Sequence, residues 1–191
     1  MKIFFDTEFT GLHKNTSLIS LGMVDENGRS FYAEFTDYDK SQVDDWIYQN
    51  VINHLINDSG KQKYEGDNWY VIGDKDFICT MLKKWLGDYD NVQLVSDVCH
   101  YDMVLFIDIF GSAFDLPEKI CPACYDVNQL IAEYYGIILK TAFDLSREEI
   151  IGESAIDGDK HNALYDAKVI KEIYYRYFKL IKTKKGGENE L

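Results

Sequence analysis

The stretch Lys-Ile-Phe-Phe-Asp-Thr-Glu-Phe at positions 2–9 places two carboxylates inside a segment that is otherwise rich in Phe and Ile. Such a segment predicts a β-strand. Alternate side chains of a strand share one face, so Asp6 and Glu8 are expected to point the same way. Acidic residues are rarely placed in a central strand without a charged partner. The segment therefore predicts both the middle of a sheet and one wall of a charged site.

Four segments are predicted to be strands. The first three form a meander, and the pair Asn27-Gly28 is a strong hairpin signal between the second strand and the third. The polar residues 58–71 are predicted to be a loop. The predicted strands are Lys2–Phe9, Leu18–Val24, Phe31–Phe35 and Val92–Ser96.

Five segments carry apolar residues at helical spacing, with Ser41 as the predicted cap of the first and Gly111 near the end of the third. Strands come first and helices later, with one strand between them, which favours a mixed α/β sheet covered by helices. No repeat or linker divides the chain, so we expect one domain over residues 1–181 and a disordered tail over residues 182–191. The predicted helices are residues 41–57, 74–86, 102–110, 125–135 and 161–181.

The composition excludes several classes of protein. The 191 residues suit one domain, and 46% hydrophobic residues with two prolines exclude a disordered chain. No apolar run is long enough to span a membrane and Asp6 interrupts any secretory segment, so we expect a cytoplasmic protein with no membrane partner. A net charge of −13 argues against a protein that grips long duplex DNA, but it allows a nuclease whose cations supply positive charge locally.

The four cysteines form no zinc set in the sequence. Cys121 and Cys124 have the spacing of a metal or redox pair, but no second pair or nearby histidine completes it. Free, partly buried thiols are the favoured interpretation of all four.

Three polar residues far along the chain are candidates to join the two carboxylates of the first strand. Asp102 follows the fourth predicted strand, and His161 and Asp166 lie at the head of the last predicted helix. If folding unites them with Asp6 and Glu8, the carboxylates need divalent cations to neutralise them. A histidine at the edge of that group can take a proton from water. Together these groups are the equipment for hydrolysing a phosphodiester.

Each candidate also has a structural interpretation. Asp102 could be a helix N-cap, and Asp166 could be a first-turn acid that interacts with the helix dipole. His161 could be a surface histidine, although the positive end of a helix is an unhelpful place for it. The remaining histidines, His13, His54 and His100, are expected to be structural.

Three segments resemble the exonuclease motifs of the DEDDh superfamily, in the same order along the chain. They are Asp-Thr-Glu-Phe-Thr-Gly-Leu at 6–12, Tyr-Asp-Met-Val-Leu-Phe at 101–106 and His-Asn-Ala-Leu-Tyr-Asp-Ala at 161–167. Residues 45–55 and 110–117 resemble the mycobacterial-type 3′→5′ exoribonucleases within that superfamily, and the similarity covers about residues 1–178. One departure is Val98, where many relatives have Asn, and Asp97 beside it is a rival candidate to assist Asp102.

The resemblance implies an RNase H-like α/β fold, with a mixed five-stranded sheet flanked by helices. It also implies two divalent cations, Mg²⁺ or Mn²⁺. The implied metal ligands are Asp6, which bridges both ions, Glu8 and Asp166 on the side of the attacking water, and Asp102 on the side of the leaving oxygen, through water. His161 would deprotonate the attacking water.

The same resemblance implies the substrate contacts. Phe9 and Leu12 would stack on or wedge against the terminal bases, with core packing as the alternative for Phe9. The main chain near Thr7 or the Glu8 carboxylate would contact the 2′-hydroxyl that distinguishes RNA from DNA. Relatives pair, so a homodimer is expected through the helix of Trp46 or through the aromatic last helix.

The expected activity is that of a metal-dependent 3′→5′ exoribonuclease that releases nucleoside 5′-monophosphates from the 3′ end of RNA, on single strands or 3′ overhangs. The preference for RNA comes from the resemblance alone. One alternative is a 3′→5′ DNA exonuclease of the proofreading or repair type. The other is a catalytically silent nucleic-acid-binding module, which would need none of the five polar residues.

Overall fold

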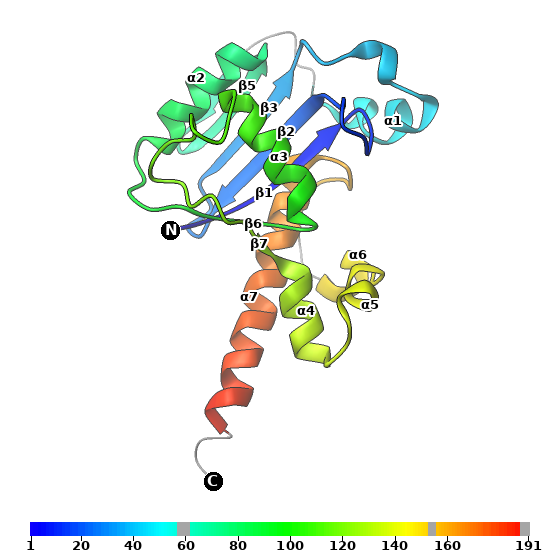
Figure 1. Ribbon diagram of the computed structural model, residues 1–191, viewed down its shortest axis with the longest axis vertical. Helices are drawn as coiled ribbons and strands as arrows, with labels where there is room; N and C mark the ends of the chain where they lie inside the picture. The colour runs from blue at the N-terminus through cyan, green and yellow to red at the C-terminus, as the bar shows by residue number, and fades with distance from the viewer. Residues whose placement is uncertain (57–61, 153–155, 188–191) are drawn as a thin grey trace.

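A seven-stranded mixed sheet lies at the centre of the protein, and helices cover its faces (Figure 1). The computed structural model describes residues 1–56, 62–152 and 156–187. The strand order β4-β5-β3-β2-β1-β6-β7 places β1 in the sheet interior, as the sequence predicted. The strands are β1 Lys2–Phe9, β2 Leu18–Asp25, β3 Ser30–Phe35, β4 Lys63–Glu65, β5 Asn68–Gly73, β6 Gln93–Ser96 and β7 Tyr125–Asp126.

The sheet has two more strands than the five that the resemblance implied. The predicted loop over residues 58–71 is wrong from residue 62 onward, where β4 and most of β5 lie, while residues 58–61 are outside the described residues. Strand β5 pairs in parallel with β3 and buries Tyr70 and Val71. At the opposite edge, the short strand β7 pairs in parallel with β6.

The predicted helices occur in the predicted order with shifted ends, and two short helices that were not predicted, α5 and α6, lie between the last two of them. The predicted helix over residues 41–57 is wrong as one element, because its described part divides into η1, α1 and η2. Asp44 rather than Ser41 caps α1, since its carboxylate accepts a hydrogen bond from the Ile47 N–H at 2.8 Å. The helices are η1 Lys40–Gln42, α1 Asp45–Asn50, η2 Ile52–His54, α2 Lys75–Leu86, α3 Cys99–Phe110, α4 Val127–Tyr135, α5 Leu139–Phe143, α6 Arg147–Ile151 and α7 Ala163–Gly187.

Two of these ends matter for the candidate site. Helix α3 begins three residues before the predicted start, after Val98, whose φ of 57° turns the chain. Helix α7 begins two residues after the predicted start, which leaves His161 in the turn ahead of it. It also runs six residues past the predicted end, into the predicted tail, and residues 188–191 lie outside the described residues.

The alternation of β1 decides which helix each of its side chains meets. Phe5 packs under α2 and α3, where its ring lies 5.5 Å from that of Phe106. Phe4 packs on the opposite face against α7, with its ring 5.4 Å from that of Tyr174. By the same alternation, Asp6 and Glu8 lie on the α7 face and Thr7 lies on the α3 face.

Helix α7 approaches the sheet closely at Gly22, which pairs with Asp6 across β1 and β2. A Cβ atom on Gly22 would lie 2.2 Å from main-chain atoms of Ala163 and Leu164, far inside van der Waals contact. Glycine therefore allows the first turn of α7 to rest directly on the strand beside Asp6.

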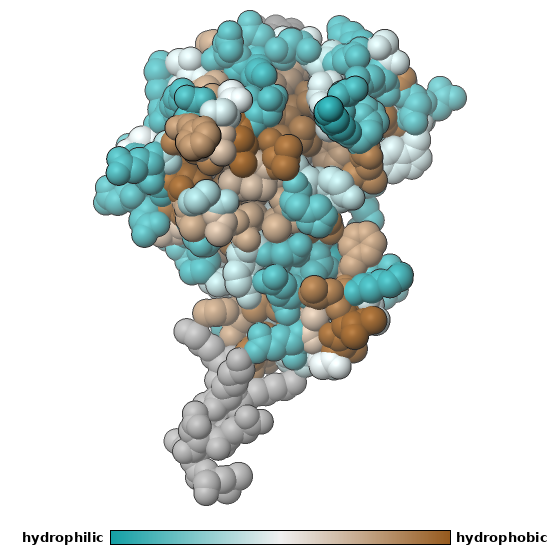
Figure 2. All heavy atoms as spheres, in the orientation of Figure 1, coloured by the Kyte–Doolittle hydropathy of each residue, from teal (hydrophilic) through white to brown (hydrophobic). Residues whose placement is uncertain are grey.

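The surface is largely hydrophilic on the face drawn in Figure 2, with apolar side chains gathered over α3 and α5. The exposed apolar residues on these helices include Val104, Leu139 and Phe143. Among the described residues, none of the helices combines the length and the apolar character needed to cross a bilayer.

Candidate active site

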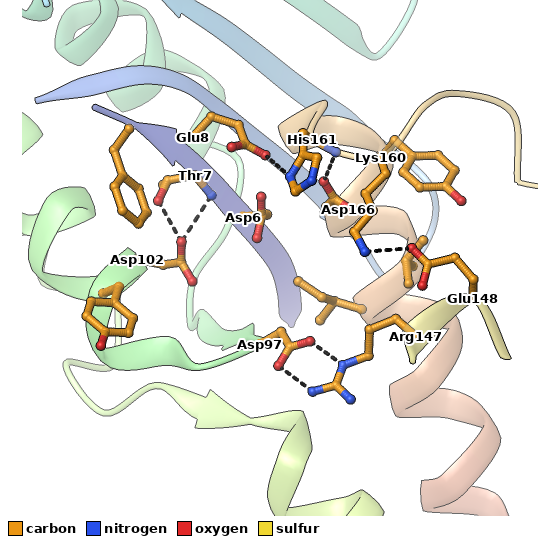
Figure 3. Close-up of a pocket in the computed structure, with 15 residues that line it drawn as sticks. Asp6, Thr7, Glu8, Asp97, Asp102, Arg147, Glu148, Lys160, His161 and Asp166 are labelled. Atoms are coloured by element: carbon orange, nitrogen blue, oxygen red, sulfur yellow. Dashed lines mark hydrogen bonds and ion pairs between the residues drawn. The ribbon is translucent and has the colours of Figure 1, made fainter. Parts of the chain in front are cut away.

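Strand β1 and helix α7 bring three carboxylates together (Figure 3). Asp6 and Glu8 project from the α7 face of β1, and Asp166 meets them from the first turn of α7. One carboxylate oxygen of each residue lies within 4.8 Å of those of the other two. The structure thus unites three of the predicted site residues from opposite ends of the chain.

His161 lies beside these carboxylates, in the turn before α7. Its backbone is in the left-handed region, with φ of 64°, which is uncommon outside glycine. Its N–H donates to Asp166 Oδ2 at 2.9 Å, and its Nδ1 atom lies 3.9 Å from Glu8 Oε1. The indole ring of Trp46 packs against its imidazole with the ring centroids 5.2 Å apart. His161 is therefore fixed from three sides.

Asp102 reaches the same pocket from the first turn of α3. Its Oδ1 atom accepts hydrogen bonds from the Thr7 N–H at 3.1 Å and the Thr7 hydroxyl at 2.6 Å. Its Oδ2 atom accepts a hydrogen bond from the Ser96 hydroxyl at 2.5 Å. The N-cap interpretation is wrong, because the cap of α3 is Val98 and the Asp102 carboxylate is turned toward β1 and β6.

The five predicted polar residues line one cavity of about 280 Å³. Thr7 and Phe9 line it too, and Phe9 also packs against the core, so the two interpretations of Phe9 are compatible. Leu12 lies outside this cavity. Its side chain is 71% exposed and borders two neighbouring cavities, which it shares with Phe9 and His13.

Burial and mutual repulsion disfavour the ionised form of these carboxylates, so their pKa values are raised. Burial raises the pKa of Asp6 well above its usual value, and the charges of Asp102 and Asp166 raise it further. Burial also raises the pKa of Glu8 to about 8, that of Asp166 to about 7 and that of Asp102 to about 6. A bound cation would offset this penalty, so the pocket favours a positively charged ligand.

The imidazole of His161 is shifted in the opposite direction. Burial lowers its pKa below the usual value, and electrostatic interactions with Lys160 and His54 lower it further. The ring is therefore neutral near pH 7 and able to accept a proton.

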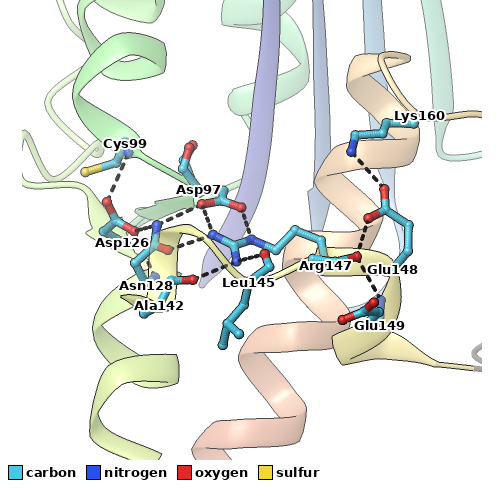
Figure 4. A network of polar contacts seen from close by, with 12 residues as sticks. Asp97, Cys99, Asp126, Asn128, Ala142, Leu145, Arg147, Glu148, Glu149 and Lys160 are labelled. Atoms are coloured by element: carbon cyan, nitrogen blue, oxygen red, sulfur yellow. Dashed lines mark hydrogen bonds and ion pairs between the residues drawn. The ribbon is translucent and has the colours of Figure 1, made fainter. Parts of the chain in front are cut away.

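Asp97, the rival candidate beside Val98, is engaged elsewhere (Figure 4). Its carboxylate forms a bidentate pair with Arg147 of α6, at 2.5 and 3.0 Å. It also accepts a hydrogen bond from the Asn128 side chain at 2.8 Å. The hydrogen bonds that hold Asp102 come from Thr7 and Ser96 instead.

The sequence did not point to the basic residues at the cavity rim. Arg147 lines the cavity, and so does Lys160, whose Nζ atom lies 3.1 Å from a Glu148 carboxylate oxygen. No local pattern marks either residue, because Arg147 meets Asp97 and Lys160 meets Glu148 only in the folded chain.

The donor atoms of the cavity suit a hard divalent cation. Asp6, Glu8 and Asp166 offer carboxylate oxygens, which Mg²⁺ and Mn²⁺ prefer to sulfur or imidazole ligands. Such a cation would also offset the raised pKa values of these side chains. The residues present therefore fit the ions that the resemblance implied.

Two solved nucleases share this fold. The nuclease domain of 3′hExo, described as a DEDDh family member bound to rAMP, superposes with a TM-score of 0.64 at 12% identity, over 93% of this chain and 91% of that one. A second structure, of a 3′-exonuclease and described as 3′-end specific recognition of histone mRNA stem-loop, superposes with a TM-score of 0.60 at 16% identity. The match covers 92% of this chain and 62% of that one. The chain therefore has the RNase H-like fold of the DEDDh exonucleases.

Sequence comparison narrows this class to one family. The family model described as a 3′-5′ exoribonuclease Rv2179c-like domain matches residues 1–177. Two Mycobacterium tuberculosis proteins, the 3′-5′ exoribonucleases Rv2179c and MT2234.1, are each 31% identical over 130 residues, which are 68% of this chain and 73% of theirs. The chain belongs to the Rv2179c-like 3′-5′ exoribonuclease family, which confirms the resemblance.

Proposed function

We propose that the protein hydrolyses RNA from the 3′ end, on single strands or 3′ overhangs, and releases nucleoside 5′-monophosphates. The observation that carries the proposal is the group of Asp6, Glu8 and Asp166, with carboxylate oxygens within 4.8 Å of one another beside His161. Family membership supports the direction of hydrolysis and the choice of RNA.

Different acidic residues of the cavity would bind each of the two cations. Mg²⁺ or Mn²⁺ ions bound there would activate the attacking water and stabilise the leaving 3′-oxygen. Asp6 suits the bridging position, because the charge of Asp102 on one side and that of Asp166 on the other both act on it. Glu8 and Asp166 would complete the side of the attacking water.

Thr7 and Ser96 orient Asp102 for an indirect contact. Two donors from Thr7 occupy the lone pairs of Oδ1, and the Ser96 hydroxyl occupies one of the two on Oδ2. One acceptor position on Oδ2 is left for the cavity. This fits a ligand that acts through water, as the resemblance implied for Asp102.

His161 acts as the general base. Its lowered pKa keeps the ring neutral, so that Nε2 can accept a proton from the attacking water. The Glu8 carboxylate, 3.9 Å from Nδ1, stabilises the imidazolium that results. The hydrogen bond from the His161 N–H to Asp166 fixes the position of this base relative to the carboxylates.

Substrate contacts follow from the same strand. Both donors of Thr7 are bonded to Asp102, so the Glu8 carboxylate is the better candidate to accept a hydrogen bond from the 2′-hydroxyl. Phe9 at the cavity wall and the exposed Leu12 next to it are placed to contact the terminal bases. Stacking tolerates every base, which suits release of nucleotides without sequence readout.

The proposal is tested with matched RNA and DNA oligonucleotides that carry a 5′ label. We expect shortening of RNA from the 3′ end with Mg²⁺ or Mn²⁺, and abolished turnover in Asp6→Ala and Asp166→Ala. The control is Asp108→Ala, an exposed aspartate of α3. Retained turnover in either site variant would overturn the assignment of these residues.

The same assay separates the two alternatives. Faster hydrolysis of the DNA oligonucleotide would identify a DNA exonuclease. A silent binding module would show no turnover and no rise in melting temperature with Mn²⁺.

We also propose the homodimer that the resemblance implied, through α1. The aromatic residues Tyr174 and Tyr177 of α7 are buried within the chain, whereas Trp46 and Tyr48 of α1 are more than half exposed, at 56% and 51%. Sedimentation equilibrium should find a dimer that Tyr48→Lys dissociates. A monomer at micromolar concentration would exclude the pairing.

A further inference from the structure

A second group of potential metal ligands lies where β6, α3 and β7 meet. Cys99 and His100 begin α3, Asp126 ends β7, and one ligand atom of each lies within 4.8 Å of those of the other two. The Cys124 thiol, two residues before Asp126, donates to the main-chain oxygen of Tyr125 at 3.8 Å and interacts electrostatically with the Cys99 thiol. We call these four residues the thiol cluster: Cys99, His100, Cys124 and Asp126.

We propose that the thiol cluster binds one zinc ion. Two thiolates, an imidazole and a carboxylate are all zinc ligands, and four protein ligands complete the tetrahedral geometry of a structural site. Sulfur donors select zinc over magnesium, so this site differs in chemistry from the oxygen-only group around Asp6. The Cys121–Cys124 spacing alone did not reveal it, because the second cysteine and the histidine come from α3.

The group needs little rearrangement to close on an ion. In a tetrahedral zinc site the ligand atoms are roughly 3.3–3.8 Å apart, as zinc–ligand distances require, so movements of about 1 Å would bring Cys99, His100 and Asp126 onto one ion. The Cys124 thiol would join them by turning away from the main-chain oxygen of Tyr125. The Asp126 carboxylate is already held in place, as Figure 4 shows. Its Oδ2 atom accepts a hydrogen bond from the Cys99 N–H at 3.3 Å, and its Oδ1 atom accepts one from the Asn128 N–H at 2.9 Å.

The charge of the bound cluster suits its position. Zinc with two thiolates and one carboxylate carries a single net negative charge, which the positive end of α3 stabilises. Burial raises the pKa of the Cys99 and Cys124 thiols, so they stay protonated until a metal displaces their protons.

Zinc would strengthen the weakest edge of the sheet. Strand β7 pairs with β6 only through Tyr125 and Asp126. The chain that follows β7 carries α4, α5 and α6, including Arg147, which lines the catalytic cavity. A metal that ties Asp126 to Cys99 would therefore hold this group of helices against the catalytic sheet.

Cobalt(II) is the probe, because thiolate ligands give an intense near-ultraviolet charge-transfer band that oxygen ligands do not. The full chain, reduced and free of metal, is titrated with Co²⁺ and then with Zn²⁺. We expect the band, and its loss on adding one equivalent of zinc. It should persist in Asp6→Ala, so the result does not depend on the nuclease site, and in Cys79→Ser as the matched control.

Two variants test the ligands with little risk to folding. His100→Ala changes an exposed residue, and Asp126→Asn keeps a side chain that can cap α4. Each should weaken zinc binding at least about 100-fold, since losing a residue that only supports a ligand costs 10–100-fold. Zinc at a hundredfold excess over its Kd should raise the melting temperature of the native protein by roughly 5–10 °C.

Three results would overturn the proposal. One is the absence of the charge-transfer band in the reduced protein, and another is an unchanged band in Cys99→Ser. The third is a Cys99–Cys124 disulfide that persists after purification under reducing conditions, because oxidised sulfur cannot ligate zinc.

Discussion

Gly22→Ala is a change of one methyl group that should displace the start of α7. The added Cβ would lie 2.2 Å from main-chain atoms of Ala163 and Leu164, whereas ordinary contacts begin near 3.4 Å. Main-chain atoms cannot rotate out of the way, so the first turn of α7 must move by about 1.2 Å in a close-packed interior. Asp166 belongs to that turn and would move away from Asp6.

The displacement should lower both activity and stability. A misplacement of about 1 Å costs on the order of 100-fold in rate, so we expect about that loss in kcat/KM. Overpacking costs about 1–3 kcal/mol, and each kcal/mol lowers the melting temperature of a chain of this size by roughly 2–4 °C. Affinity for Mn²⁺ should also fall, because the displaced Asp166 carboxylate would lie too far from Asp6 and Glu8 to bind the same ion.

Gly28→Ala is the matched control for this variant. Gly28 lies between β2 and β3 at φ of 99°, where an alanine is strained but its Cβ meets nothing within 4 Å. The control therefore costs stability without touching α7. Single-turnover hydrolysis of 5′-labelled RNA, thermal unfolding and Mn²⁺ calorimetry would be compared for both variants. Wild-type turnover and Mn²⁺ affinity in Gly22→Ala would refute the idea that this close approach positions the site.

Three further predictions follow from the cavity. His161→Ala should lower kcat by about 10²–10⁴-fold while Mn²⁺ still raises the melting temperature, and loss of that rise would make His161 a metal ligand instead. Thr7→Val removes one hydrogen bond to the buried Asp102 and should cost about 1–3 kcal/mol in urea unfolding, and an unchanged midpoint would show that the hydroxyl is dispensable. In EDTA the pKa values of about 8 for Glu8 and about 7 for Asp166 exceed those of an unfolded chain, so the folded state binds protons more tightly. Metal-free stability should therefore fall as pH rises from about 4 to about 8, and Mg²⁺ should raise the melting temperature most at the upper end; a flat metal-free profile would contradict this.

The sequence predicted β1 and its neighbours because their signals are local. Apolar content, alternation and the Asn27-Gly28 turn are properties of a few consecutive residues, and the structure pairs β1, β2 and β3 as expected. Strand β4 was missed because its three side chains are all exposed at the sheet edge and carry no apolar pattern. Strand β5 was missed although Trp69-Tyr70-Val71-Ile72 is a run of strand-favouring residues, because the polar residues that precede this run led to the prediction of a loop.

The candidate site shows the same division between local and long-range information. Motif spacing could name Asp6, Glu8, Asp102, His161 and Asp166, and strand alternation placed Asp6 and Glu8 on one face. The sequence could not say which helix that face meets. The alternation of β1 sends Asp6 and Glu8 toward α7, while it sends Thr7 toward α3, where it holds Asp102. Asp102 is therefore separate from the group of Asp6, Glu8 and Asp166. Hydrogen bonds from residues of two strands, β1 and β6, hold its carboxylate. The choice between Asp97 and Asp102 depends on the same contacts, since Arg147 reaches Asp97 from a helix 50 residues away in the sequence. No pattern within one segment contains that pairing, so the division of labour among the acidic residues is a property of the folded chain.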